Sequence, residues 1–200
     1  MRRQVDGGGT LMRARLRAAA LPVLMMLVAG VSIAAPARAD HRLDQHWDRN
    51  TPTATAVAQV YFVDHTGPNW PVASMIAGPW DNRPAYYRPY YLLPGNCTPS
   101  ALHCVPVTTI NNPGVGRGVT TYNVNWATLH IVHGSMTVEL NNAYSYTTAL
   151  RREVTCHELG HATGVLWEGS QDGSCMKGGA PYVDTATPHD YNVIEAVYNH

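Results

Sequence analysis

The most informative stretch of the chain runs from Thr147 to Gly164 and reads TTALRREVTCHELGHATG. Thr147 or Thr148 can cap the start of a helix, and Gly164 can end it, so the pattern predicts one helix over residues 147–164. His157 and His161 are four residues apart, which places both on one face of that helix. Two neutral imidazoles so placed can reach a single metal ion, and zinc suits such ligands best.

Glu158 follows the first histidine directly and projects to the side of that face. There it can hold a water molecule on the metal, take its proton and pass that proton to a leaving amine. The motif His157-Glu158-Leu159-Gly160-His161 therefore predicts metal-assisted hydrolysis, with His157 and His161 as zinc ligands and Glu158 as general base. A helix with two incidental surface histidines is the alternative.

The start of the chain has the three parts of a secretory signal peptide, which we expect to span residues 1–39. These parts are a positive segment (Arg13, Arg15, Arg17), an apolar run over residues 18–35, and the small-residue cleavage signal Ala37-Arg38-Ala39. The true start is Met1 or Met12. A membrane anchor is less favoured because the apolar run is shorter than the roughly 20 residues that a span needs. We therefore expect a secreted, extracellular protein without stable membrane insertion after signal removal.

The length and charge of the rest of the chain exclude several classes of function. Two hundred residues suit one domain. Residues 40–200 carry 8 basic and 13 acidic side chains, a net charge of −5, and Lys177 is their only lysine. Nucleic acids and anionic membranes need clustered lysine and arginine, so we expect neither as a partner. We expect a monomer.

Four cysteines in an exported protein indicate disulfides, and three pairings are possible. We favour the local pairing, Cys97–Cys104 and Cys156–Cys175. The chain has no CxxC spacing, so a cysteine-based zinc site is not expected.

The residue pattern predicts an α+β fold, because strands precede the main helix. We expect strands over residues 54–63, 105–110 and 118–124, a strand or strand pair over 129–140, and helices over 70–80, 147–164 and 188–200. Residues 40–54 are polar and charged, so we expect a loose N-terminal arm in which His41 and His46 are solvated. Residues 81–104 look irregular, with several tyrosines covering them. Residues 165–190 look like loop. We expect His130 and His133 at the surface, poorly placed to share a metal.

Gly164 lies three residues after His161, and Met176 follows in the loop Ser174-Cys175-Met176. With the terminal helix from Pro188, these features resemble small secreted bacterial metzincins, a matrixin-like group of zinc metallopeptidases typical of actinobacteria. Their longer motif is HExxHxxGxxH followed by a Met-turn. The specific resemblance covers residues 153–200.

The resemblance implies a single zincin-like domain over residues 55–200, with a mixed sheet, an active-site helix and a C-terminal helix. It implies a zinc-dependent endopeptidase that takes a protein or peptide substrate, with Met176 beneath the metal. By the same resemblance, the segment Ser135–Leu140 would be the edge strand that aligns an extended substrate. Tyr182 does not have the spacing of the family's tyrosine that stabilises the oxyanion.

The chain departs from that family at position 167, where the third ligand should be. Trp167 stands there, and an indole N–H cannot bind zinc. Three accounts stay open: Glu168 supplies a carboxylate from a loop one residue longer, which we favour; Asp172 or His189 moves in; or the site has degenerated. The last account would make the protein a zincin-fold binding module with weak zinc or none.

Overall fold

The computed structural model describes residues 45–49, 57–81, 86–97, 103–163 and 173–199. The chain divides into two compact units, Met1–Arg38 and Ala39–His200, and every described residue belongs to the second. The expected signal peptide over residues 1–39 and the first part of the arm lie outside the described residues. None of the helices within the described ranges has the length and apolarity to cross a membrane.

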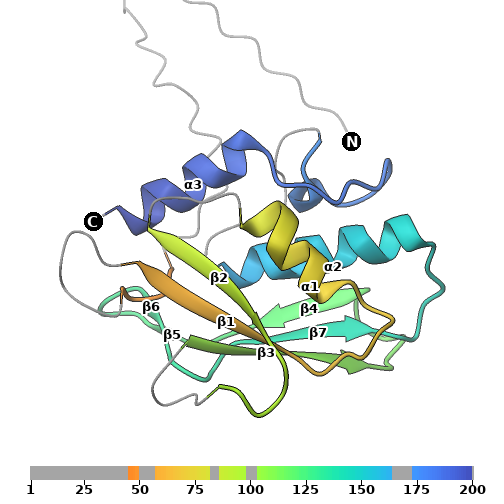
Figure 1. Cartoon of the computed structure of the whole chain (residues 1–200), viewed down its shortest axis with the longest axis horizontal. Helices are drawn as coiled ribbons and strands as arrows, with labels where there is room; N and C mark the ends of the chain where they lie inside the picture. The colour runs from red at the N-terminus through yellow and green to blue at the C-terminus, as the bar shows by residue number, and fades with distance from the viewer. Residues whose placement is uncertain (1–44, 50–56, 82–85, 98–102, 164–172, 200) are drawn as a thin grey trace, which may run out of the picture. The chain divides into compact units, whose positions relative to one another are not determined.

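The described residues form a mixed α+β fold around a five-stranded sheet (Figure 1). The strand order is β2-β1-β3-β7-β4. Strand β1 pairs in parallel with β2 and β3, β3 pairs in parallel with β7, and β4 runs antiparallel to β7. These strands are β1 (Ala58–Asp64), β2 (Tyr87–Leu92), β3 (His103–Ile110), β4 (Gly118–Thr121) and β7 (Thr137–Asn141). A separate two-stranded hairpin consists of β5 (Val124–Asn125) and β6 (His130–Ile131).

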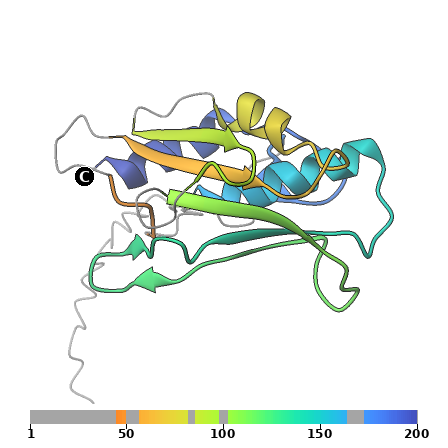
Figure 2. The same cartoon turned by 60° about the horizontal axis from the view of Figure 1, so that its bottom comes forward.

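The helices lie together beside the sheet, as Figures 1 and 2 show. The long helix α2 packs on β4 and β7, whereas α3 and the turn η1 pack on β2. The helical segments are α1 (Val72–Met75), its π-helical continuation η1 (Ile76–Trp80), α2 (Thr148–Ala162), the 3₁₀ turn η2 (Cys175–Lys177) and α3 (Pro188–Tyr198). The predicted helices therefore all form.

Side-chain caps fix where the two longer helices begin. The Thr147 hydroxyl accepts the backbone N–H of Leu150 at 3.1 Å, which confirms one of the two predicted caps of α2. Thr187 caps α3, and the Asp190 carboxylate in turn accepts the backbone N–H of Thr187 at 2.6 Å. This reciprocal pair is a capping box, which satisfies two backbone donors at once.

The prediction of irregular structure over residues 81–104 is wrong for β2 and for the start of β3. Pro89 lies within β2 and lacks the N–H that a central strand would need. The strand tolerates it because β2 is the outermost strand on its side of the sheet. The tyrosines also do more than cover a loop: Tyr87 is fully buried, and Tyr90 stacks on Tyr61 with ring centroids 5.0 Å apart.

The edge strand is also not the one expected. Strand β7, which contains most of Ser135–Leu140, lies inside the sheet between β3 and β4. Its side chains Val138 and Leu140 are fully buried. The edge on this side is β4, because the chain turns back through the β5–β6 hairpin and β7 then runs antiparallel to β4 on its inner side. Residue pattern alone cannot tell which of two neighbouring strands is the outer one.

The arm is not loose where the structure describes it, over residues 45–49. Trp47 is fully buried, and its indole N–H donates to the carbonyl of Ala162 at the end of α2, at 3.1 Å. His46, expected in solvent, is only 6% exposed. Residues 45–49 of the arm therefore pack into the core.

Replacement of the buried indole tests that conclusion. We expect Trp47→Ala to lower the free energy of unfolding by about 3–5 kcal/mol, because it removes a fully buried ring and leaves a cavity. Trp126→Ala is the matched control, since Trp126 is 73% exposed and should cost little. Urea unfolding followed by circular dichroism measures both. Equal effects of the two substitutions would mean that the arm is not part of the core.

Candidate functional site

The two histidines of the HELGH motif meet on one face of α2. Their Nε2 atoms are 3.0 Å apart, and the rings are nearly perpendicular with centroids separated by 4.6 Å. Two nitrogen ligands of one tetrahedral zinc ion, each about 2.0 Å from it, would be separated by about 3.3 Å. The pair is therefore close to the spacing that a shared ion requires.

The turn that faces His157 selects the tautomer of its neutral ring. Its Nδ1 lies 2.9 Å from the carbonyl oxygen of Cys175, which can only accept a hydrogen bond. Nδ1 therefore carries the proton, and Nε2 keeps the lone pair that a metal needs. A neutral histidine held in this way is a typical metal ligand.

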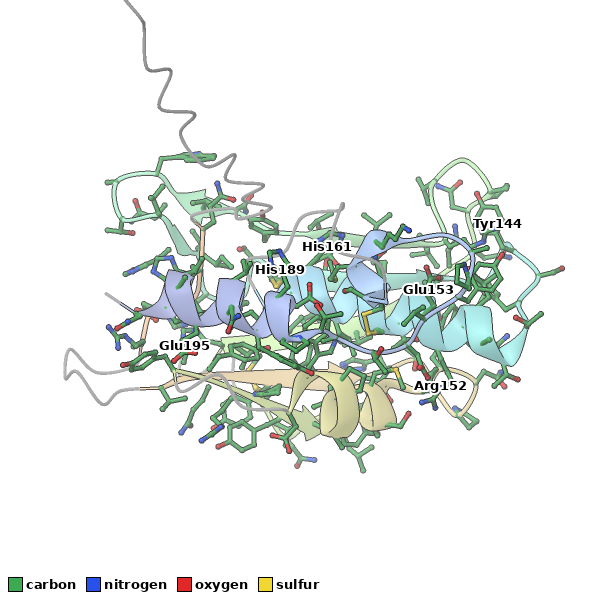
Figure 3. The ribbon with its side chains drawn as sticks, turned by 90° about the horizontal axis from the view of Figure 1, so that it is seen from above. Tyr144, Arg152, Glu153, His161, His189 and Glu195 are labelled. Carbon is green, nitrogen blue, oxygen red and sulfur yellow. A yellow bond between two sulfur atoms is a disulfide. The ribbon has the colours of Figure 1, made fainter. Side chains whose placement is uncertain are left out.

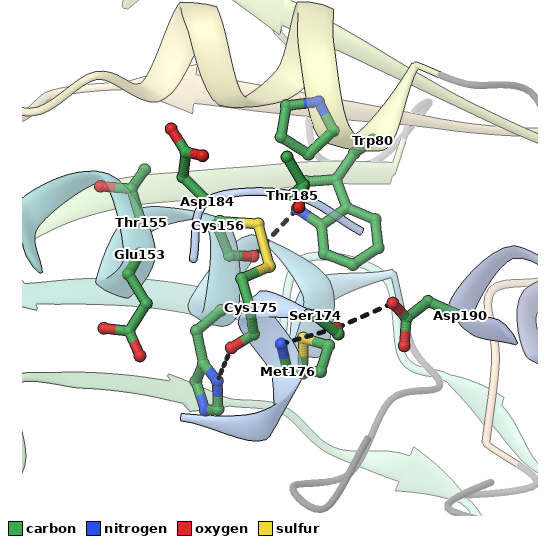
Figure 4. The surroundings of a disulfide bond; sticks show 12 residues. Trp80, Glu153, Thr155, Cys156, Ser174, Cys175, Met176, Asp184, Thr185 and Asp190 are labelled. Carbon is green, nitrogen blue, oxygen red and sulfur yellow. Dashed lines mark hydrogen bonds between the residues drawn. A yellow bond between two sulfur atoms is a disulfide. The ribbon is translucent and has the colours of Figure 1, made fainter. Parts of the chain in front are cut away.

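A disulfide holds that carbonyl in place. Cys156, the residue before His157, is bonded to Cys175 in η2 (Figure 4). Cys97 is bonded to Cys104, so both predicted disulfides are confirmed. The Trp80 indole N–H donates to the Cys156 carbonyl at 2.9 Å, which adds a third segment to the junction.

Met176 lies in η2, directly against α2. Its side chain is fully buried, and a Cβ added at Gly160 would come within 3.0 Å of both its sulfur and the Trp80 ring. Ser174 fixes the turn on its other side, because its hydroxyl accepts the Met176 N–H at 3.0 Å and donates to Asp190 of α3 at 2.8 Å. The turn is thus tied to two helices.

Glu158 points toward the edge strand β4. Its side chain is 6% exposed, and the Thr120 hydroxyl lies 2.8 Å from its Oε2 and 3.0 Å from its backbone oxygen. A Cβ at Gly118 would come within 3.0 Å of the Glu158 carboxylate, so the carboxylate occupies space that only glycine leaves. Sequence reasoning missed both Thr120 and Gly118, because their proximity to α2 depends on β4 being the edge.

A cavity of about 430 Å³ opens beside this carboxylate, between α2, the start of β4 and the turn after η2. His157 and Glu158 line it, together with the phenol of Tyr182. Its other charged and apolar lining residues are Arg117, Leu150, Glu153, Val154 and Lys177. The arrangement offers acidic, basic and apolar groups next to the two histidines.

Glu153 is a further acid of this cavity that the sequence did not single out. It lies one helical turn before His157, and Figure 3 shows it on the same helix as His161. Burial raises the pKa of its carboxyl group, while His157, the Gly179 N–H at 3.1 Å and Arg117 act in the opposite direction. A carboxyl group with a raised pKa holds its proton closer to neutral pH than an exposed glutamate does.

The raised pKa predicts a pH dependence of stability. The folded chain binds this proton more tightly than the unfolded chain, so the contribution of Glu153 to the free energy of unfolding falls as pH rises through its two pKa values. In Glu153→Gln the free energy of unfolding should not fall in this way, since the amide does not titrate and its oxygen can still accept the Gly179 N–H. We expect the variant to gain stability relative to the parent as pH rises from about 4 to about 8.

Urea midpoints measured with a chelator present provide the test. Glu195→Gln, a change at an exposed glutamate of α3, is the control and should leave the profile unchanged. Parallel profiles of the parent and Glu153→Gln would contradict the raised pKa.

The candidates for the third ligand are only partly described. Trp167, Glu168 and Asp172 lie outside the described residues. Among the described residues, no third histidine, cysteine or carboxylate, His189 of α3 included, brings a ligand atom within 4.8 Å of those of His157 and His161. Glu168 therefore stays a prediction.

The described residues hold one other group that could bind a metal ion. Ligand atoms of Asp48, His103 and His133 all lie within 4.8 Å of one another. His133 is exposed, as expected, and its ring stacks on that of His103, whereas His130, also expected at the surface, is half-buried. No sequence pattern indicates this group, because its members are far apart along the chain.

The chain matches none of the protein-family models and none of the curated proteins with which it was compared. The function proposed below therefore depends on the residues of the site.

Proposed function

We propose that the protein is a secreted, metzincin-like zinc endopeptidase. The observation that carries the proposal is the arrangement of His157, His161 and Glu158: two imidazole nitrogens 3.0 Å apart, beside a buried carboxylate that faces a cavity at the edge of the sheet. The two disulfides support an extracellular location, where such bonds persist. The signal-like residues 1–39 support it as well.

The donor set fits zinc. His157 presents an Nε2 lone pair because its Nδ1 proton is held by the Cys175 carbonyl, and His161 presents its Nε2 beside it. We propose that the Glu168 carboxylate completes the set. When bound there, zinc would supply Lewis acidity, which lowers the pKa of water and polarises the carbonyl of the scissile bond.

Glu158 performs the proton transfers in this proposal. Its carboxylate takes a proton from the attacking water and delivers it to the amide nitrogen, so that the peptide bond breaks into a carboxylic acid and an amine. Thr120 holds one carboxylate oxygen at 2.8 Å, and in this proposal the other oxygen takes the proton. No covalent intermediate with the protein is required.

Strand β4 is the natural place for the substrate. It lies at the outer edge of the sheet, so one side of its backbone is open to pair with an extended peptide. Such pairing would carry the scissile bond past Glu158, since Gly118 and Thr120 already contact that side chain. A substrate side chain would enter the cavity, where Leu150 and Val154 provide apolar surface.

Replacement of the general base tests the proposal. We expect Glu158→Gln to lower the rate of peptide hydrolysis by about 100-fold or more, because the amide cannot accept the proton. The zinc content should not change, since Glu158 is not a ligand in this scheme. Cleavage of unfolded casein and of a quenched-fluorescence peptide library measures the activity.

Glu195→Gln is the control and should keep full activity. Unchanged activity of Glu158→Gln would remove Glu158 from the mechanism. A loss of activity accompanied by an equal loss of zinc would instead mean that Glu158 serves as a ligand.

Trp167, at the position of the family's third ligand, favours a second candidate function. In that case the same cavity and edge strand would bind an extended peptide without cleaving it. The outcome that separates the two functions is peptide binding by the parent protein with no hydrolysis at saturating zinc.

A further inference from the structure

A second group of metal-ligand side chains involves neither histidine of the HELGH motif. It consists of Asp48 in the arm, His103 at the start of β3 and His133 in the loop between β6 and β7. Asp48 Oδ1 lies 3.2 Å from His103 Nε2 and 3.4 Å from His133 Nε2. The two imidazole rings stack, with centroids 4.4 Å apart.

These distances match a shared ion. Ligand atoms about 2.0 Å from a tetrahedral zinc ion are separated by about 3.3 Å. Asp48 Oδ1 is itself buried and has no hydrogen-bond partner within the described part of the chain, although the two ring nitrogens flank it. A buried carboxylate oxygen without a partner is costly, and a cation at this point would balance its charge.

The backbone beside two of the ligands, Asp48 and His103, is held independently of any ion. His46 pairs with the β6 segment on both sides: its N–H donates to Leu129 at 3.1 Å, and its carbonyl accepts from Ile131 at 2.8 Å. Trp47, the residue before Asp48, is fixed to the end of α2. His103 is adjacent to Cys104, which is disulfide-bonded to Cys97. The backbone next to Asp48 and His103 is therefore in place before an ion binds.

The exposure of the three side chains leaves room for solvent ligands. His103 is fully buried, whereas the side chains of Asp48 and His133 are each 41% exposed. An ion held by all three would lie between the core and the surface, with water in its remaining position. Burial, reinforced by the nearby His133, lowers the pKa of His103, and a neutral ring is the form that binds metals.

We propose that Asp48, His103 and His133 form a second binding site for a divalent first-row metal ion, best suited to zinc. Two imidazoles with one carboxylate favour such an ion over calcium or magnesium, which prefer oxygen ligands. The Asp48 backbone carbonyl lies 2.9 Å from His103 Nε2 and can only accept, so Nε2 carries the ring proton before an ion binds. Binding replaces this contact and requires the proton to move to Nδ1, which is buried and has no hydrogen-bond partner among the described residues. The ion then fastens residues 45–49 to β3 and to the loop before β7, so its role is to stabilise the arm.

The test separates this site from the HELGH pair. In the variant His157→Ala/His161→Ala, which lacks the first pair, titration calorimetry at neutral pH should still show about one zinc ion bound per chain. Adding Asp48→Asn or His133→Ala should weaken that binding by more than about 10-fold. Adding His65→Ala, a change at an exposed histidine just after β1, is the matched control and should leave it unchanged.

Thermal unfolding provides a second measurement. Zinc should raise the Tm of the His157→Ala/His161→Ala variant. It should not raise the Tm once Asp48→Asn is added to that variant. Calcium should raise the Tm of neither protein. If His157→Ala/His161→Ala does not fold, the single substitutions are made in the parent chain and their zinc content is measured. Asp48→Asn and His133→Ala should then each bind one zinc ion fewer than His65→Ala. Zinc binding that is equal in all of these variants, or absent from them, would overturn the proposal, and so would a preference for calcium.

Discussion

The close approach of helix α2 to the turn η2 is the constraint on which the site depends. It is possible because residue 160 is glycine: a Cβ there would collide with Met176 and with the Trp80 ring. At this distance the Cys156–Cys175 disulfide can form, and the Cys175 carbonyl comes within 2.9 Å of His157 Nδ1. The absence of a side chain at Gly160 thus allows the contact that places the proton of the neutral His157 ring on Nδ1. The Trp80 indole, which donates to the Cys156 carbonyl, extends the same junction to the segment that follows α1.

A second glycine allows a close approach on the other side of α2, at the edge of the sheet. Gly118 leaves the space that the Glu158 carboxylate fills, and Thr120 of the same strand fixes its orientation. The proposed base is thus positioned by the strand on which an extended substrate would pair. If Glu158 acts as proposed, substrate alignment and proton transfer depend on the same few residues of β4.

The local features of the site could be predicted from sequence, and the non-local ones could not. The spacing of His157 and His161, the Thr147 cap and the two short-range disulfides follow from residues close together along the chain. The edge position of β4, the pairing of β2 with β1 and the burial of Trp47 depend on which distant segments meet. The Asp48–His103–His133 group was missed for the same reason, since three separate segments bring it together. Pro89 also misled the prediction, because an edge strand accepts a proline that a central strand rejects.

In the proposed site, His157 and His161 share one zinc ion with a third protein ligand, and Glu158 lies beside them. Anomalous diffraction at the zinc absorption edge, from crystals of the purified protein grown with zinc, tests it most directly. We expect a peak about 2.0 Å from both Nε2 atoms, with a carboxylate oxygen of Glu168 at a similar distance. The absence of a peak between these histidines, whatever is found at Asp48, His103 and His133, would contradict it.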